Sequence, residues 1–492
     1  MKQEVLRIER ASCMEKGVMQ LDNFSLSIFS GEIIGLLPVN NHGLTALLRL
    51  LQHNIPLRSG YVYYREEQVN SWRNMKHRGN RIGLIQSESC LVEGLTVADN
   101  IFVLRPGFKS MLIHPALLHR QLLPFLASIG IQIAADAYVE ELNPFERIVV
   151  DVLKAVVAGC RLIVLRDISA ELCEEELQKI HVLLRHYVSQ GFSFLYIDFH
   201  FEDMNQICDQ VALMSNGRII KVLDSKTTTS EAFVSYTEGY SRMVEQFNRF
   251  LSESEQVKPV FEVRDLCGEC VNHLDFSVAA GECLVLQDVD NHVFRELLLL
   301  LSGERNPVSG GFFVQGKPAD LRGGRELAVI QELPTKTMLF QDLSYLDNLC
   351  FTLDHRLTEI WRSVRVREGI RREYEPLLGS EVFDMRVDLL SEKQKYELVY
   401  HRIANQKPEV VFCVQPFRRA DIELRMQIWE LLKMLLDKQI AVVILAVNLA
   451  DSLSLADRLI RLKQGYAGEI YRHSEFSMMP VRAPWVNDRP EE

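Results

Sequence analysis

Short apolar runs alternate with amphipathic stretches along most of the chain. RLIVL from Arg161, FSFLYI from Phe192 and VALM from Val211 are apolar runs bounded by polar residues. Runs of this length and composition are typical of buried strands. Amphipathic segments such as EEELQKIHVLLRHYVSQG, from Glu174, lie between them. This alternation predicts an α/β architecture built on parallel sheets.

The second half of the chain repeats the pattern of the first. Gly31-Glu32 returns as Gly281-Glu282, an offset of 281 − 31 = 250, and LTVADN from Leu95 returns as LSYLDN from Leu343, an offset of 343 − 95 = 248. The strand RLIVL has its counterpart in VVFCV, and CDQVALMSNG has its counterpart in ADRLIRLKQG. Near-constant spacing over so many elements indicates an internal duplication.

The duplication predicts two similar domains, which together suit a chain of 492 residues. We place the first domain at 1–230 and the second at 259–478. Inside each, the pattern becomes mainly helical for about 70 residues, so we expect an inserted helical subdomain at about 88–159 and another at about 335–406.

The remaining segments and the composition exclude several classes of protein. Residues 231–258 are charged and helix-prone, so we expect a helical connector there, and a Pro-rich, disordered tail at 479–492. The net charge is 55 − 66 = −11, which gives no basic face for nucleic acid. No uncharged apolar run reaches the roughly 18 residues of a membrane-spanning helix, and we expect no signal peptide at the start.

The stretch GEIIGLLPVNNHGLTALLRLL, 31–51, has the layout of a phosphate-binding P-loop: a buried strand, a turn and a helix. Laid over G-x-x-x-x-G-K-[ST], its key positions are Pro38, Gly43, Leu44 and Thr45. The second glycine and the hydroxyl are present, but the first glycine and the lysine are not. We assign six residues to this degenerate nucleotide-binding loop: Asn40, Asn41, His42, Gly43, Leu44 and Thr45.

The second copy, GECLVLQDVDNHVFRELLLLL at 281–301, has diverged further, since Asp288 and Val293 replace both glycines. Arg295 could hold an anion at the start of the helix. One histidine in each loop is too few ligands for a metal ion. The residues that we assign to this loop are Asn291, His292, Phe294 and Arg295.

The ten cysteines are scattered singly except for Cys267 and Cys270 in DLCGEC. One C-x-x-C without a second ligand pair is weak evidence for zinc or redox chemistry. We therefore expect reduced thiols in a cytosolic protein.

The order of these elements resembles the ATP-binding-cassette (ABC) ATPase subunit of a ribose- or galactose-type sugar importer, in which two nucleotide-binding domains are fused. LTVADNIFV is similar to LTVAENIF of that family, and ICDQVALMSNGRII to its ICDRVTVLRDGR. The resemblance covers about Leu6 to Tyr471. It implies two tandem P-loop NTPase domains, each with a helical subdomain, and two Mg-ATP molecules sandwiched between domains.

The resemblance also shows what the ATP sites have lost. The family's signature LSGGQ corresponds to LNPFE and LSEKQ here, neither of which keeps the glycine pair that lets the backbone approach the γ-phosphate. The Mg²⁺ aspartate of the Walker B element is replaced by Arg166 and Val414. The signature-like residues are Leu142, Asn143, Leu390 and Ser391.

The positions of the other catalytic groups are also altered. Asp167 and Gln415 stand where the catalytic glutamate is expected, and Phe199 and Val447 stand where the switch histidine is expected, with His200 one residue further on. The coupling glutamine of the Q-loop is retained as Gln86, with Gln331 near its partner position. Thr45 could ligate Mg²⁺, although a threonine at the start of a helix is commonly a cap.

These losses favour a catalytically inactive, cytoplasmic protein at the inner face of the cell membrane. We predict a scaffold or regulatory subunit whose helical subdomains dock on a membrane permease subunit or a signalling membrane protein. Leu91 and Val92 are expected to be exposed beside Gln86 and to contact the partner. The alternative is an active but divergent ATPase that uses ATP and Mg²⁺ to energise carbohydrate import. A third class, an anion sensor acting through Arg295, also stays open.

Overall fold

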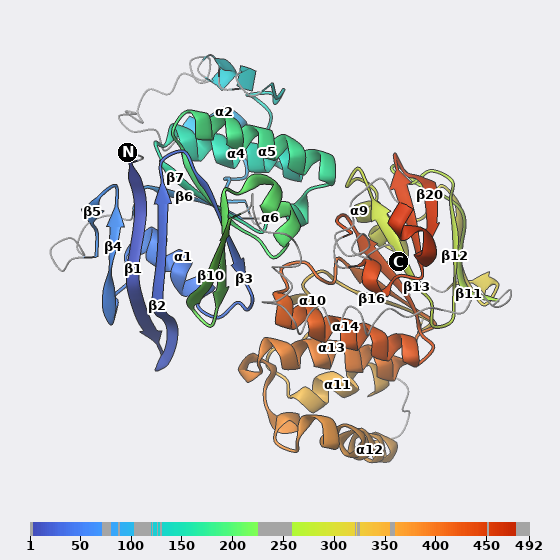
Figure 1. Cartoon of the computed structure of the whole chain (residues 1–492). Helices are drawn as coiled ribbons and strands as arrows, with labels where there is room; N and C mark the ends of the chain where they lie inside the picture. The colour runs from blue at the N-terminus through green and yellow to red at the C-terminus, as the bar shows by residue number, and fades with distance from the viewer. Residues whose placement is uncertain are drawn as a thin grey trace, which may run out of the picture. The chain divides into compact units, whose positions relative to one another are not determined.

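The computed structural model (Figure 1) describes most of the chain. The predicted connector, apart from Lys258, and the predicted tail lie outside the described residues, as does 103–119 of the first helical insertion. No helix in the described part is long and apolar enough to cross a membrane. The described residues are 3–70, 80–86, 89–102, 120, 122–124, 126–127, 130–224, 258–319, 321, 325–354, 360–449 and 452–478.

The chain divides into two compact units, each with two sheets. The first unit comprises Met1–Tyr240 and Arg419–Glu423, and the second Ser241–Arg418 and Leu424–Glu492. In the first unit an antiparallel sheet has the order β2-β1-β4-β5. Its strands are β1 (Glu4–Glu15), β2 (Val18–Phe29), β4 (Ser59–Tyr64) and β5 (Glu67–Gln68).

The larger sheet of the first unit has the order β10-β9-β3-β8-β7-β6. Its strands pair in parallel except for the β9–β10 hairpin at one edge. Strands β3 and β8 are buried along their whole length, which explains why their sequences are continuously apolar. The strands are β3 (Ile33–Pro38), β6 (Ile82–Gln86), β7 (Leu162–Arg166), β8 (Ser193–Ile197), β9 (Gln210–Ser215) and β10 (Arg218–Asp224).

Helix α1 (Leu44–His53) lies against β2 and shares one core with both sheets (Figure 1). Its apolar positions fall on the buried side, as the helical period requires. The other described helices of this unit are α2 (Val97–Phe102), α4 (Pro144–Val157), α5 (Glu174–Ser189) and α6 (Phe201–Ile207), with short 3₁₀ turns η1 (Val139–Glu141) and η2 (Ser169–Glu171).

The second unit repeats both sheets in the same order, β12-β11-β14-β15 and β16-β17-β18-β13-β19-β20. Its strands are β11 (Pro259–Cys267), β12 (Leu274–Ala279), β13 (Cys283–Asp288), β14 (Ser309–Val314), β15 (Lys317–Pro318), β16 (Leu327–Ile330), β17 (Val410–Val414), β18 (Ala441–Ala446), β19 (Arg458–Lys463) and β20 (Tyr466–Arg472). Its described helices are α9 (Phe294–Leu301), α10 (Pro334–Thr337), α11 (Tyr345–Asp354), α12 (Ile360–Leu378), α13 (Glu392–Gln406) and α14 (Ile422–Asp437), with 3₁₀ turns η3 (Val382–Asp384), η4 (Val387–Leu389), η5 (Leu453–Leu455) and η6 (His473–Met478).

In both units the helical insertion lies between the edge strand of the large sheet and the next strand, that is, between β6 and β7 and between β16 and β17. The shared strand order explains the constant spacing of the sequence repeat. The predicted α/β fold of two tandem domains, each with a helical insertion, is confirmed.

Candidate functional site

The loop that follows β3 is fastened to the turn between β9 and β10. The backbone N–H of Val39 donates to the carbonyl of Met214 at 2.8 Å. The side chain of Asn40 donates to Asn216 Oδ1 at 3.1 Å and accepts from the Asn216 N–H at 3.1 Å. This reciprocal pair gives Asn40 a structural role in shaping the loop.

Gly43 ends this loop with a left-handed backbone, φ 81°. A Cβ atom at this position would come 2.2 Å from the carbonyl oxygen of Gln20, so only glycine fits. The preceding His42 places its Nε2 2.6 Å from the carbonyl oxygen of Met19. Both residues therefore pack the loop against β2, which accounts for the retained glycine without a phosphate.

Leu44, at the position of the P-loop lysine, is only 1% exposed and belongs to the apolar core of the first unit. The side chain points into protein, so this position supplies no charge to a ligand. Thr45 is exposed on the first turn of α1, while Gly43 is the residue that caps the helix. Thr45 is thus not the cap, and its assignment as a Mg²⁺ ligand stays a prediction.

In the second unit, the carboxylate of Asp288 binds the backbone amides at the start of α9. Asp288 ends β13 and is 1% exposed, and its Oδ2 accepts from the backbone N–H groups of Val293 at 2.6 Å and Phe294 at 3.2 Å. Amides at the start of such a helix are the donors that cradle an anion. In this unit the Asp288 carboxylate accepts the hydrogen bonds of these amides.

The electrostatics of Asp288 reflect this enclosed position. Burial raises the pKa of its carboxyl above the ordinary value, against the opposing effect of the backbone amides of Val293, Phe294 and His292. Phe294, at the lysine position, is buried, whereas Arg295 is exposed. Because the first amides of α9 already bind Asp288, Arg295 has lost the backbone donors expected beside an anion ligand.

The Walker B positions have the same backbone geometry in both units. Asp167 follows β7 in a left-handed conformation, φ 56°, and Gln415 follows β17 in the same way, φ 42°. The N–H of Asp167 donates to the Ile197 carbonyl at 2.9 Å, and that of Gln415 to the Leu445 carbonyl at 2.8 Å. The fold thus holds both positions in the same backbone geometry, while the side chains differ.

A buried carboxylate that the sequence reasoning missed lies after β8. Asp198 Oδ2 accepts from Ser169 Oγ at 2.6 Å, and Oδ1 accepts from the backbone N–H groups of Phe199 at 2.7 Å and His200 at 3.1 Å. Burial opposes ionisation, but the contacts with His200 and Ser169 hold the pKa of Asp198 below its ordinary value. A polar residue directly after a buried strand was the available signal.

The residues at the two positions expected for the switch histidine belong to the apolar core. Phe199 is 5% exposed and Val447 is 3% exposed, so neither presents a polar group to a ligand. The neighbouring His200 places its Nδ1 3.3 Å from Asp198 Oδ1. His200 therefore lies beside the chain's own carboxylate.

The signature-like residues begin helices in both units. Asn143 caps α4 in a capping box with Glu146, and Ser391 caps α13 in a capping box with Gln394. Leu142 and Leu390 are buried beside them. Gln86 ends β6 half-buried, and Gln331 is exposed just after β16. Any role of these residues in nucleotide contact stays a prediction.

Known proteins resemble this chain in sequence. A family model described as ABC transporter matches residues 21–167. The ribose import ATP-binding protein RbsA 1 of Rhizobium johnstonii is 25% identical over 487 residues, covering 96% of this chain and 94% of that protein. The xylose import ATP-binding protein XylG of Geobacillus kaustophilus is 22% identical, covering 96% and 97%.

Solved structures match both units at once. A structure titled RNase-L Inhibitor aligns with a TM-score of 0.58 at 13% identity, covering 94% of this chain and 90% of that one. Ribosome-bound archaeal ABCE1 with Pelota aligns with a TM-score of 0.64 at 13% identity, covering 95% and 79%. At such identities the likeness concerns the fold. The repeated strand order and the paired helical insertions give two α/β domains in tandem with the fold of ABC nucleotide-binding domains, and the sequence is similar over nearly its whole length to ribose and xylose import ATP-binding proteins.

Proposed function

We propose that this chain is the cassette subunit of a carbohydrate import system and that it has lost ATP hydrolysis, acting as a scaffold or regulatory subunit on a membrane permease. Its full-length relatives are named for ribose and xylose import, which supports the carbohydrate assignment. The proposed loss of hydrolysis rests on the residues of the two P-loop-like loops. Leu44 and Phe294, at the lysine positions, are buried apolar residues, and the Asp288 carboxylate accepts from the amides at the start of α9.

Energetics favour this proposal over a merely weakened enzyme. A charge-assisted phosphate contact contributes roughly 1.5–3 kcal/mol net. A micromolar site has only about 8 kcal/mol in total. Loss of the lysine, the Mg²⁺ carboxylate and the signature glycines removes most of that energy. Phosphoryl transfer suffers more than binding, because it depends on positioned charges.

An active ATPase is the second candidate, and it is favoured by the relatives, each of which is named an import ATP-binding protein. Gly43, Thr45, Gln86 and Asp167 are the groups it would use in the first unit. This candidate alone requires ATP-dependent phosphate release, so hydrolysis separates the two.

Matched apolar residues in the helical insertions support docking. Val92 is 52% exposed and its counterpart Phe340 is 46% exposed, while Leu91 is only 9% exposed. The expectation that Leu91 is exposed is therefore wrong, because its side chain is buried. We assign the docking surface to four exposed apolar residues, Val92 in the first unit and Phe340, Leu343 and Phe351 in the second. Other apolar side chains of the insertions are exposed as well, namely Leu123, Tyr138, Val364, Leu377 and Leu389.

The backbones of Val92 and Phe340 are each held by the side chain of an asparagine. Asn100 is fully buried, and its side chain accepts from the Val92 N–H at 2.7 Å and donates to the Val92 carbonyl at 3.1 Å. Asn348 does the same for Phe340, at 2.9 and 3.0 Å. An exposed apolar residue held on a rigid backbone suits contact with a partner helix.

We expect the combined variant Val92→Asp, Phe340→Asp to leave the membrane fraction of the native host, with the membrane-bound share falling at least about tenfold, since each new charge would be desolvated in the interface. Wild-type protein should sediment with membranes. Fractionation followed by immunoblotting measures the effect.

The control variant carries Val182→Asp and Leu377→Asp, at residues that are 70% and 74% exposed on α5 and α12. It should remain with the membranes, and circular dichroism should show both variants folded. Membrane binding by the Val92→Asp, Phe340→Asp variant, or wild-type protein found only in the soluble fraction, would contradict the docking proposal.

A further inference from the structure

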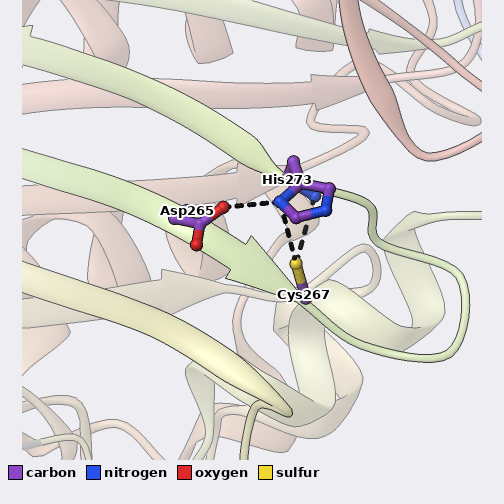
Figure 2. A group of neighbouring side chains, drawn as sticks. All are labelled: Asp265, Cys267 and His273. Atoms are coloured by element: carbon purple, nitrogen blue, oxygen red, sulfur yellow. Dashed lines mark hydrogen bonds and ion pairs between the residues drawn. The ribbon is translucent and has the colours of Figure 1, made fainter.

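Three side chains of different chemistry meet at the hairpin between β11 and β12 (Figure 2). Asp265 and Cys267 come from β11, and His273 immediately precedes β12. His273 Nδ1 lies 2.6 Å from Asp265 Oδ1 and 3.5 Å from Cys267 Sγ. The three ligand atoms lie within 4.8 Å of one another. Carboxylate, thiol and imidazole thus converge on one point.

The backbone holds this arrangement in place. The pairing of β11 with β12 shifts register between Val263 and Leu266, and both Asp265 and His273 have left-handed backbones, each with φ 46°. The N–H of Asp265 donates to Asp275 Oδ1 at 2.8 Å, and the N–H of His273 donates to Cys267 Sγ at 3.4 Å. Hydrogen bonds within the hairpin therefore fix the backbone of Asp265 and orient the Cys267 sulfur.

The first unit builds the same hairpin with other residues. Arg10 and Asn23 have left-handed backbones there, φ 45° and 53°, and the N–H of Asn23 donates to Ser12 Oγ at 3.0 Å. The N–H of Arg10 donates to Ser25 Oγ at 3.0 Å. The bulge is thus a property of the fold and does not depend on metal-binding side chains.

The comparison shows what is special to the second unit. Arg10, Ser12 and Asn23 are replaced by Asp265, Cys267 and His273, each of which is a common metal ligand. A structural exchange of Ser12 for a thiol acceptor would explain the cysteine alone. It does not explain a carboxylate facing an imidazole at the two other matched positions.

We propose that Asp265, Cys267 and His273 bind a divalent transition-metal ion, zinc, with a fourth position open to water. One sulfur, one nitrogen and one oxygen ligand suit zinc, which accepts all three in tetrahedral sites. The side chains of Asp265 and His273 are 61% and 67% exposed, which gives the ion a path from solvent.

One of the two distances to His273 Nδ1 already fits a tetrahedral site, and the other must lengthen when the ion binds. Bond lengths of about 2.3 Å to sulfur and about 2.0 Å to nitrogen place these two atoms about 3.5 Å apart, which matches the 3.5 Å between Cys267 Sγ and His273 Nδ1. The contact between Asp265 and His273 must open from 2.6 Å to about 3.4 Å as the ion replaces the proton on Nδ1. The thiol proton of Cys267 is released as well.

Cys270, the other cysteine of the C-x-x-C sequence, does not belong to this group. Its N–H and those of Glu269 and Val271 donate to the Glu296 carboxylate on α9, which turns the loop toward that helix. Burial, with the Glu296 charge, raises the pKa of the Cys270 thiol and disfavours its thiolate. Cys270 therefore offers a matched control.

The test is a titration of fully reduced, full-length protein with Co²⁺, whose thiolate complexes absorb in the near ultraviolet. Wild type should bind one equivalent with a thiolate charge-transfer band, and Zn²⁺ should displace it. Cys267→Ser should abolish the band, and His273→Asn should weaken binding by more than about 100-fold, beyond the loss typical of an outer-shell partner. Both variants introduce the residue that the first unit has at the same backbone position.

Cys270→Ser and Cys90→Ser, the second at an exposed free cysteine, should bind Co²⁺ as wild type does. Circular dichroism verifies that each variant is folded. The proposal would be overturned if wild type shows no charge-transfer band or if Cys267→Ser keeps the band. It would also be overturned if His273→Asn binds Co²⁺ as tightly as wild type, or if Cys270→Ser loses the band.

Discussion

Purified full-length protein should release phosphate from Mg-ATP at less than about 0.1 s⁻¹, well below the range of ordinary enzymes. Leu44 and Phe294 are buried at the two lysine positions, and Arg166 and Val414 stand at the two Mg²⁺ positions. Loss of a single positioned group that stabilises the transition state commonly costs about 10²–10³ in rate. Several such losses in each half together should abolish measurable turnover.

Two variants make the hydrolysis measurement specific. Asp167→Ala should leave the background unchanged, because Asp167 has no catalytic role in this account. Leu44→Lys should not restore turnover, since Leu44 is 1% exposed and packed in the core of the first unit. Turnover of about 0.1 s⁻¹ or more that Asp167→Ala abolishes would establish an active, divergent ATPase.

Replacement of Asp288 by glycine should free the backbone N–H groups at the start of α9 to bind another anion. The buried amides of Val293 and Phe294 would lose their acceptor, which costs about 1–3 kcal/mol for each unsatisfied donor. We therefore expect Asp288→Gly to lower the free energy of unfolding by about 2–5 kcal/mol. Inorganic phosphate should recover part of that loss by occupying the vacated position.

Urea unfolding of wild type and variants, with and without phosphate, measures both effects. Asp290→Gly is the matched control, because Asp290 lies in the same loop but is exposed. Wild type and the control should gain no stability from phosphate. If phosphate stabilises wild type as strongly as Asp288→Gly, the carboxylate does not fill the cradle.

The fold could be predicted because burial leaves a clear mark on the sequence. Strands covered on both faces, such as β3 and β8, are continuously apolar, and the repeat shows the same order of elements twice. The loops could be located too, since strand, turn and helix keep their spacing even where Leu44 replaces a lysine.

The contacts and burial of the side chains in these loops could not be predicted, because sequence spacing does not show which way a side chain points. Asp288 stood at a glycine position, but only the structure shows its carboxylate accepting from the amides that start α9. Leu91 and Val92 are adjacent and both apolar, yet one is buried and the other exposed. Their difference depends on how Asn100 fixes the segment.

The group of Asp265, Cys267 and His273 could not be predicted from the sequence for a related reason. From the sequence, the C-x-x-C of Cys267 and Cys270 was only weak evidence for a metal site, and reduced thiols were expected. A register shift in β11 and the return of the chain at β12 instead bring Asp265 and His273, eight residues apart, beside Cys267. The hairpin pairing of β11 with β12, and not the C-x-x-C spacing, creates this group.

Isothermal titration calorimetry with Mg-ATP tests the central claim most directly, because it measures binding whether or not hydrolysis follows. The account predicts no saturable heat at micromolar concentrations for either half of the full-length protein. The first unit is the more sensitive part of the test, since Gly43, Thr45 and Gln86 are still present there. A clear one-site isotherm with a micromolar dissociation constant, weakened by Thr45→Ala, would contradict the account.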